Sequence, residues 1–256
     1  MKHPELYKHQ KVVVLGLARS GQAVARLFHR FGARVVANDR KPEEECPEAE
    51  SLRQLGIEVI CGHHPEDLID TDTALVVKNP GIPYRIPPVQ HALAHGIEVV
   101  TEVEVAYHIR KSPLIAVTGS NGKTTTTQWI TNCFRNDGKK AQAAGNIGTP
   151  LSETAEHSGA DEWLVVELSS FQLKGTIDFR PNIACLLNVS ETHLDYHGTM
   201  EDYVQSKLKM TANQTPEDTF VVNWDDEVCR QAAAASKARL FPFSMTKQLD
   251  RGVFLQ

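Results

Sequence analysis

The feature that most constrains the fold is a regular alternation of short apolar runs with amphipathic stretches. From Lys11 the chain reads "KVVVLG", "GQAVARLFHRFG" and "RVVAND", and the alternation continues through "SLRQLG", "IEVI", "TALVVK" and "VQHALAHG". Short strands bounded by glycine and separated by helices are typical of parallel sheets built from right-handed crossovers. The sequence therefore predicts an α/β fold that begins with a doubly wound, Rossmann-like domain.

A second α/β domain follows the first. The charged patch and the proline of "HIRKSP" separate the first domain from a new apolar run, "LIAVTG". Further strands are predicted in "EWLVVELS", "NIACLLNVS", "TFVVNW" and "RGVFLQ", and helices after Lys123 and in "MEDYVQSKLKMTANQ". A chain of 256 residues suits two domains. We place them at residues 1–111 and 112–256.

Composition excludes several classes of partner. No stretch approaches the ~20 apolar residues of a membrane span, and the start, "MKHPELYKHQ", lacks the apolar core of a secretory signal. These features predict a cytoplasmic protein without a membrane partner. A net charge of −5 with scattered basic residues predicts no nucleic-acid partner. The five cysteines form no Cys-x-x-Cys pair, which predicts reduced, mostly buried thiols.

The first glycine-rich turn, "GLARSG", follows a strand and opens a helix, and Asp39 ends the next strand. This is the place of a dinucleotide fingerprint, but Ala18 stands where a glycine normally lets the backbone approach a pyrophosphate. A nicotinamide or flavin dinucleotide is therefore disfavoured. The helix N-terminus suits the diphosphate of another nucleotide, and the alternative is a tight turn that binds nothing. In "KNPGIPYRIP", two prolines make a rigid turn from which Asn79 could reach a ligand.

The second glycine-rich turn, "TGSNGKTTT", resembles a shortened phosphate loop, because Val117 stands where the usual fingerprint has its first glycine. Its glycines allow backbone N–H groups to turn inward. Lys123 supplies a charge for the β and γ phosphates, and Thr124 offers a hydroxyl to Mg²⁺. Glu167, at the end of "EWLVVE", is a candidate metal ligand of the Walker-B kind.

A third segment, "NVSETHLDYHG", brings His193, Asp195 and His197 close together in sequence. A zinc protease motif is excluded, because Leu194 stands at the place of the glutamate. Whether any of the three side chains binds Mg²⁺ or phosphate stays open. On the predicted helix that follows, Tyr203 and Lys207 share a face, and spacing alone predicts only a solvated lysine.

Together, "TGSNGKTTT", "AGNIG", "ELSSFQL" and "NVSETHLDYHG" followed by "YVQSKLKM" resemble the Mur ligase family of peptidoglycan synthesis. The segments "GLARSG", "NPGIP" and "ELSSFQL" are similar to the branch that adds D-glutamate. The resemblance implies an ATP-dependent carbon–nitrogen ligase that joins D-glutamate to UDP-N-acetylmuramoyl-L-alanine through an acyl phosphate. It also implies a P-loop-type central domain in which the shortened loop is the family's own form.

The resemblance assigns residues to each ligand. Lys123, Asn146, His193 and Lys207 would be catalytic. One Mg²⁺ would bind Thr124 and Glu167, and a second would bind His193 and a carbamylated Lys207, which the Tyr-x-x-x-Lys arrangement favours over Lys209. Asn146 would also contact substrate. The ATP-binding residues would be Gly119, Ser120, Asn121, Gly122, Lys123, Thr124 and Thr125. The residues around the UDP group would be Leu17, Ala18, Asp39, Arg40 and Asn79.

The sequence departs from the family in length. Family members have a third, Rossmann-like C-terminal domain that has no counterpart in this sequence. We expect the central domain to lack its last strands, and we therefore expect substrate binding without turnover. Three alternatives stay open. They are a sibling ligase that adds L-alanine to UDP-N-acetylmuramate, a non-catalytic nucleotide-binding module, and a two-domain oxidoreductase, which Ala18 disfavours.

Overall fold

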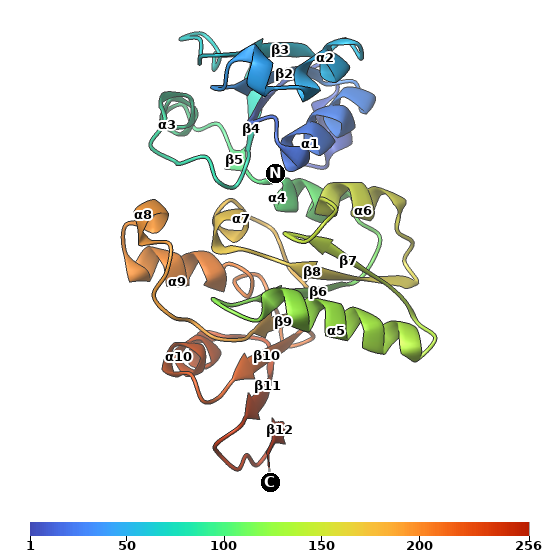
Figure 1. Ribbon diagram of the computed structural model, residues 1–256, viewed down its shortest axis with the longest axis vertical. Helices are drawn as coiled ribbons and strands as arrows, with labels where there is room; N and C mark the ends of the chain where they lie inside the picture. Colours follow the sequence, from blue (N-terminus) through green and yellow to red (C-terminus); the bar gives the residue numbers. More distant parts are fainter. Residues whose placement is uncertain (256) are drawn as a thin grey trace. The chain divides into compact units, whose positions relative to one another are not determined.

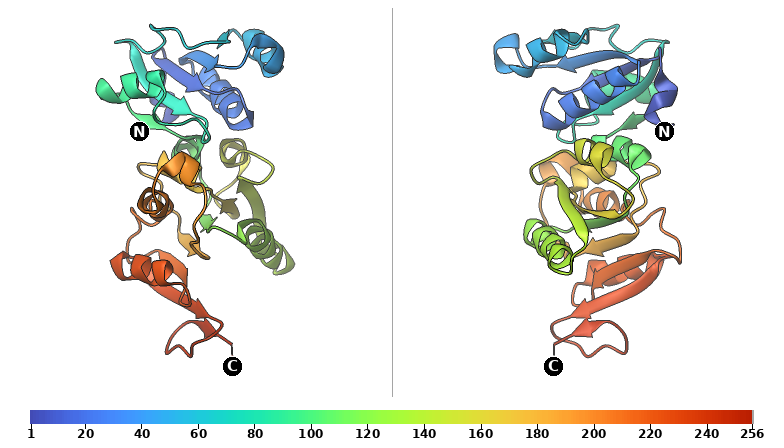
Figure 2. Two further views of the ribbon diagram at one scale, coloured as in Figure 1. Left: turned by 60° about the vertical axis from the view of Figure 1, so that its left-hand side comes forward. Right: turned by 90° about the vertical axis from the view of Figure 1, so that its right-hand side faces the viewer.

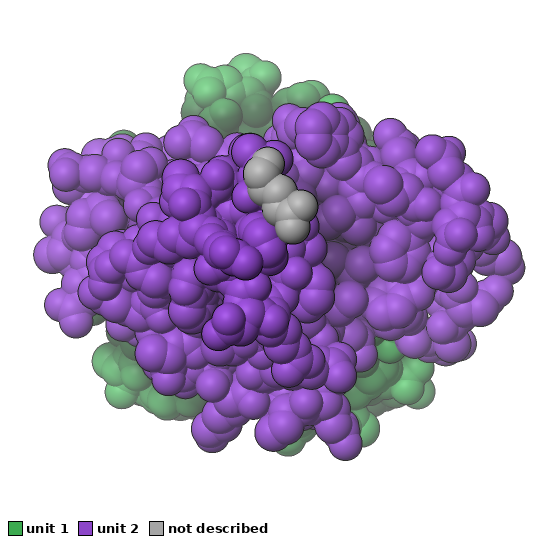
Figure 3. Space-filling view, turned by 90° about the horizontal axis from the view of Figure 1, so that it is seen from below, with its two compact units in different colours: residues 1–110, 175–177 green, residues 111–174, 178–256 purple. Residues whose placement is uncertain are grey.

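The computed structural model describes residues 1–255 and divides the chain into two compact units. Unit 1 consists of Met1–Arg110 with Gly175–Ile177, and unit 2 consists of the remainder (Figure 3). Each unit contains one sheet in which every strand pair is parallel (Figure 1). The predicted α/β class with parallel sheets is therefore confirmed. No helix within residues 1–255 is long and apolar enough to cross a membrane.

The sheet of unit 1 has the order β3-β2-β1-β4-β5. Its strands are β1 (Lys11–Leu15), β2 (Arg34–Asp39), β3 (Glu58–Cys61), β4 (Thr73–Lys78) and β5 (Val99–Val100). Its helices are η1 (Pro4–Tyr7), α1 (Arg19–Arg30), η2 (Glu43–Glu45), α2 (Glu48–Arg53), α3 (Pro87–Ala94) and α4 (Glu102–Ile109). The chain runs outward from β1 to β3 and then returns to the other side of β1. Such a reversal opens a crevice at the carboxyl ends of β1 and β4.

Helices cover both faces of this sheet (Figures 1 and 2). Val12 and Val14 pack in a core with α1, α2 and α4, whereas Val13 and Leu15 pack on the other face with α3. Every residue of β1 is buried as a result, which is why the strand reads as a continuous apolar run. The close approach of α1 to β1 requires glycine at position 21, because a Cβ there would lie 1.9 Å from the Gly16 carbonyl oxygen.

The sheet of unit 2 has the order β12-β11-β10-β9-β6-β8-β7. Its strands are β6 (Leu114–Thr118), β7 (Lys140–Gly145), β8 (Glu162–Glu167), β9 (Ile183–Leu186), β10 (Thr219–Asn223), β11 (Arg239–Ser244) and β12 (Val253–Phe254). Its helices are α5 (Lys123–Asn136), α6 (Leu151–His157), α7 (Ser170–Lys174), α8 (Leu194–His197), α9 (Met200–Leu208) and α10 (Glu227–Ala235). Because β6 pairs with both β8 and β9, the segments after these three strands leave the same edge of the sheet.

Several predicted elements are shorter than expected, and the strand predicted over "NIACLLNVS" is limited to β9. The helix predicted over "MEDYVQSKLKMTANQ" ends at Leu208, and turns follow. There the Thr211 hydroxyl donates to the Leu208 carbonyl at 3.0 Å, which satisfies an acceptor that a continuing helix would have used. The strand predicted over "RGVFLQ" is limited to β12, which pairs with the end of β11. Gln256, its last predicted residue, lies outside the described residues.

Candidate functional site

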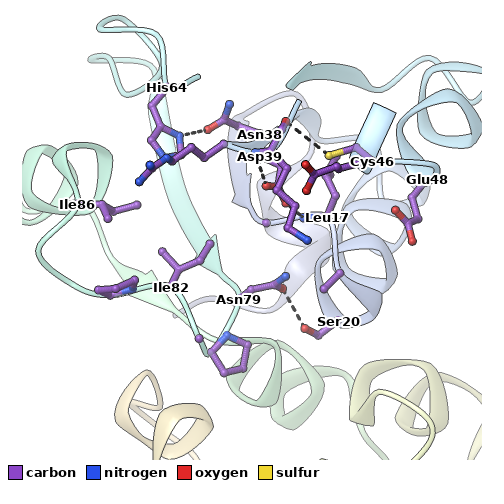
Figure 4. Close-up of a pocket in the computed structure, with 18 of the residues that line it drawn as sticks. Leu17, Ser20, Asn38, Asp39, Cys46, Glu48, His64, Asn79, Ile82 and Ile86 are labelled. Atoms are coloured by element: carbon purple, nitrogen blue, oxygen red, sulfur yellow. Dashed lines mark hydrogen bonds between the residues drawn. The ribbon is translucent and has the colours of Figure 1, made fainter. Parts of the chain in front are cut away.

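Unit 1 contains a cavity of about 670 Å³ at the carboxyl ends of β1, β2 and β4 (Figure 4). This volume lies in the usual range of small-molecule sites. The residues that the sequence analysis assigned to the UDP group all line it, namely Leu17, Ala18, Asp39, Arg40 and Asn79. The structure therefore brings together five residues that lie as far apart as positions 17 and 79 of the sequence.

Two of these residues shape the glycine-rich turn. The Asp39 carboxylate accepts a hydrogen bond from the Leu17 backbone N–H at 2.9 Å, so in this conformation that N–H is not available to a diphosphate. Asn79 lies directly on Gly16, where an added Cβ would come within 2.6 Å of its side chain, and it accepts from the Ser20 hydroxyl at 2.9 Å. Ala18 gives α1 no side-chain cap, and it lines the cavity at the positively polarised N-terminus of the helix.

The turn that carries Asn79 is held by Lys78, which the sequence analysis did not single out. Its side chain is buried at the end of β4. The ammonium donates to the carbonyl oxygens of Asn79, Pro80 and Ile82 at 3.3, 3.2 and 2.9 Å. A buried cation that satisfies three carbonyls stabilises one conformation of this turn. A lysine that ends an otherwise apolar strand was the available signal.

In unit 2, three predicted residues meet at the carboxyl edge of the sheet. The Glu167 carboxylate, at the end of β8, is buried. One of its oxygens accepts from the Thr124 hydroxyl at 2.7 Å, and the other accepts from the Asn146 amide at 2.9 Å. The backbone supports this arrangement, because the Asn146 N–H also donates to the Glu167 carbonyl. The loop before α5, the end of β7 and the end of β8 therefore form one polar cluster.

In the candidate phosphate loop, the lysine side chain is bound to carbonyl oxygens of the loop itself. The Lys123 ammonium donates to the carbonyl oxygens of Gly119 and Ser120 at 3.0 and 2.9 Å. Gly122 has φ +83°, a left-handed conformation that favours glycine at the start of α5. Thr125 lies exposed in the first turn of that helix. The loop thus already follows the path from strand to helix that a phosphate site requires.

Residues from two other segments brace this loop. Asn188, just after β9, accepts from the Asn121 N–H at 2.9 Å and donates to the Asn121 carbonyl at 3.1 Å. The Tyr203 hydroxyl of α9 lies 2.9 Å from the Ser120 hydroxyl. Asn188 was not predicted from the sequence, and Tyr203 stood out there by its spacing alone. A polar residue directly after a buried strand was the signal for Asn188.

Lys207 is buried, contrary to the expectation from helix spacing alone. Its side chain is 2% exposed, its ammonium donates to the Gly119 carbonyl at 2.9 Å, and it lies 4.5 Å from the centre of the Tyr203 ring. Lys123 shares the same carbonyl acceptor. Burial, with the neighbouring charge of Lys123, lowers the pKa of Lys207 to about 7. In a large fraction of the molecules, the Lys207 side chain is therefore an uncharged amine at neutral pH.

The structure separates the three polar side chains of "HLDYH". His197 is buried, and both of its ring nitrogens are engaged, Nδ1 with the Asp202 carboxylate at 2.7 Å and Nε2 with the Ser170 hydroxyl at 2.9 Å. His193 and Asp195 are exposed. His193 has φ +58°, and its ring lies 6.3 Å from that of Tyr203. Of the two histidines, only His193 offers a ring for a ligand near the loop.

The polar cluster offers part of the ligand set of one Mg²⁺ ion. The hydroxyl and carboxylate oxygens of Thr124 and Glu167 are ligands that Mg²⁺ prefers. Among residues 1–255, however, neither Glu167 nor His193 belongs to a group of three histidine, cysteine or carboxylate side chains close enough to hold a metal ion. Further ligands would have to come from a bound phosphate, water or a modified side chain.

A glycine-rich loop with Lys and Thr at a helix N-terminus, beside an acidic strand end of a parallel sheet, is the arrangement typical of P-loop-type domains. Here it is joined to a Rossmann-like unit with a nucleotide-sized cavity. Comparison with known protein families identifies the family of the chain. Residues 117–253 match the Mur ligase middle domain, and residues 10–101 match the MurD-like N-terminal domain of Mur ligases. The chain belongs to the Mur ligase family.

Two curated relatives carry the name UDP-N-acetylmuramoylalanine--D-glutamate ligase. The one from Geobacillus sp. (strain WCH70) is 53% identical over 100% of the chain and 56% of its own length. The one from Listeria innocua is 47% identical with the same coverage. The chain thus spans about 56% of the length of these relatives.

The fold is shared with a solved structure of UDP-N-acetylmuramate:L-alanyl-γ-D-glutamyl-meso-diaminopimelate ligase from Neisseria meningitides. The match has a TM-score of 0.58 at 16% identity and covers 95% of this chain and 82% of the other.

Proposed function

We propose that this chain carries the UDP-substrate site and the ATP site of an ATP-dependent ligase that adds D-glutamate to UDP-N-acetylmuramoyl-L-alanine in cytoplasmic peptidoglycan synthesis. The names and identities of the two curated relatives support the choice of substrates. The observation that carries the proposal is the polar cluster of unit 2, in which Thr124 and Asn146 both bind Glu167 beside the loop of Lys123.

ATP would bind at the loop from Gly119 to Thr125. Its phosphates would replace the loop carbonyls as partners of the Lys123 ammonium, which is a stronger interaction because both groups are charged. Thr124 and Glu167 would hold one Mg²⁺ ion by their oxygens. Bound Mg²⁺ would offset the repulsion between the triphosphate and a substrate carboxylate.

Lys207 would act as a carbamate rather than as an ammonium. An amine must lose its proton before it attacks CO₂, and the lowered pKa of Lys207 supplies that neutral form at neutral pH. In this modification an N–C bond forms, one proton leaves, and the product carries an anionic oxygen pair. With His193 these oxygens would hold a second Mg²⁺, for which the unmodified lysine offers no ligand.

The reaction would have two steps. The terminal carboxylate of UDP-N-acetylmuramoyl-L-alanine takes the γ-phosphoryl group of ATP, and ADP leaves. The amine of D-glutamate then attacks the acyl carbon, phosphate leaves with the bonding pair, and the amine loses a proton. Lys123 and Asn146 would position oxygens of the reacting groups. They would accelerate the reaction by holding the γ-phosphate and the substrate carboxylate, two anions, at close range.

The UDP group would occupy the cavity of unit 1. The N-terminus of α1 at Ala18 suits the diphosphate, and Asp39, Arg40 and Asn79 would surround the nucleoside. Because Asp39 also fixes the Leu17 N–H, we expect Asp39→Ala to weaken binding at least tenfold through loss of the turn conformation.

Isothermal titration calorimetry with UDP-N-acetylmuramoyl-L-alanine tests this assignment on wild type and Asp39→Ala. Asp72→Ala is the matched control, because Asp72 is exposed on the same unit and does not line the cavity. Equal heats for wild type and Asp39→Ala would remove the assignment. A parallel titration with UDP-N-acetylmuramate separates a sibling ligase that adds L-alanine, which would prefer the ligand without the alanine.

A further inference from the structure

Asn38 and His64 form a hydrogen-bonded pair at the unit 1 cavity, and the sequence analysis assigned neither. Asn38 is wholly buried in β2, and its Nδ2 donates to the carbonyl oxygens of Ile60 and His63 at 3.0 and 2.8 Å. A carbonyl oxygen only accepts, so these two contacts fix which end of the amide is nitrogen. Its Oδ1 is therefore left as an acceptor, and it contacts His64 Nδ1.

This contact determines the tautomer of His64. Because Asn38 Oδ1 cannot donate, His64 Nδ1 must carry a proton. A neutral imidazole then has its lone pair on Nε2. Burial lowers the pKa of His64, although the charge of Asp39 opposes that shift, so the neutral form predominates at neutral pH. His64 lines the cavity together with Arg40. The same two residues also line a second, adjoining cavity, so their side chains lie at the same end of the first one.

The cavity thus presents two different groups at this end. Neutral His64 offers a hydrogen-bond acceptor at Nε2, and Arg40 offers only donors. The edge of a uracil base is complementary to this pair, because an imide N3–H donor lies next to carbonyl oxygens. A cytosine base has an unprotonated N3 at the same position, which would place a lone pair against the lone pair of Nε2. The N-terminus of α1 and the glycine-rich turn remain for the diphosphate.

We propose that His64 is the residue that selects uracil in this site, with Nε2 accepting the N3–H of the base. This inference rests on the proposed function of the cavity as the UDP site. Asn38 is a positioning residue in this scheme, since it acts by holding the proton on His64 Nδ1. His64 alone of the pair touches the ligand.

The test compares UDP with N3-methyl-UDP, in which a methyl group replaces the hydrogen, and with CDP. Calorimetry on the full chain at pH 7.5 is expected to give about tenfold tighter binding of UDP than of either analogue. His64→Ala should reduce that ratio to about one. His64→Gln, whose side-chain oxygen still accepts, should restore part of it. His63→Ala is the matched control, because His63 does not line this cavity and Asn38 contacts only its backbone.

A pH series separates recognition from a structural effect. Protonation turns Nε2 into a donor, so the wild-type preference for UDP over N3-methyl-UDP should disappear as pH falls through the lowered pKa of His64. The preference of His64→Gln should not follow that transition. The titratable and charged groups that act on His64 are Asp39 and Arg40 after β2 and the neighbouring His63. Lys41, Glu45 and Glu48 also line the cavity.

The outcomes distinguish the two proposals. Equal binding of UDP and N3-methyl-UDP by wild type would overturn the role of His64 and leave the UDP site intact. An unchanged ratio in His64→Ala would do the same. Absence of binding by both UDP and UDP-N-acetylmuramoyl-L-alanine would overturn the proposed function of the cavity, and the inference with it.

Discussion

Replacement of Lys207 by methionine should make unit 2 more stable at neutral pH. The pKa of Lys207 falls from 10.5 to about 7 in the folded chain. Between these values the unfolded chain binds one more proton than the folded chain, so the stability contributed by this group rises with pH. A shift of this size corresponds to about 4 kcal/mol at pH 7. Methionine has a similar shape without the charge. It loses the hydrogen bond to the Gly119 carbonyl, about 1 kcal/mol, and the contact of the ammonium with the Tyr203 ring, which contributes little while the amine is largely neutral.

Urea denaturation followed by tryptophan fluorescence measures this effect, because Trp129, Trp163 and Trp224 all lie in unit 2. The buffers must be free of CO₂, since carbamylation would change the charge of Lys207. We expect Lys207→Met to raise the free energy of unfolding by about 3 kcal/mol at pH 7 and by much less near pH 10. Lys139→Met, at an exposed position, is the control and should change little.

A stability difference between Lys207→Met and wild type that stays constant from pH 7 to pH 10 would refute the reasoning. So would a Lys207→Met variant less stable than wild type at pH 7. Either result would mean that Lys207 titrates near its ordinary pKa despite its burial.

Three further predictions concern the loop, the turn and the thiols. Thr124→Val removes the donor to Glu167 and a metal ligand, so calorimetry should show at least tenfold weaker binding of MgATP; an unchanged affinity would exclude Thr124 from the site. Gly21→Ala should lower the melting temperature of unit 1 by more than about 5 °C, because the new Cβ would collide with the Gly16 backbone. Gly81→Ala is the control and should not lower it, because Gly81 has open space around it. Similar melting temperatures of the two variants would contradict the packing argument. Among residues 1–255, Cys133 is the exposed thiol, Cys61 is half-buried and the other three are buried, so Ellman's reagent should modify about one thiol per native chain rapidly and a second more slowly. Fast reaction of three or more would show that the buried thiols open.

The local sequence pattern predicted most strands correctly, because strands that are buried on both faces consist mainly of apolar residues. The segment that forms α4 shows where this fails. "EVEVAYHI" alternates charged and apolar residues, as a strand does, yet it is helical and buries Glu102 and Glu104. The Glu104 carboxylate accepts from the Ile177 N–H, a residue far along the chain. A contact at that sequence separation leaves no local signal.

The edge strand β7 was missed for a different reason. Its sequence, "KAQAAG", contains three alanines and no β-branched residue. Its strand conformation depends on pairing with β8 along its whole length. Here the neighbouring strand, and not intrinsic propensity, decides the conformation.

The sequence by itself determined most of the strands, the glycines at the two turns, and the chemical groups available beside them. Periodicity and residue type are local properties, so they can be read along the chain. Tertiary structure alone decided the ionisation of Lys207, the engagement of both His197 nitrogens and the tautomer of His64. Each depends on burial or on a partner distant in sequence, as Gly119 is from Lys207, and electrostatic energies depend on distance in space rather than along the chain.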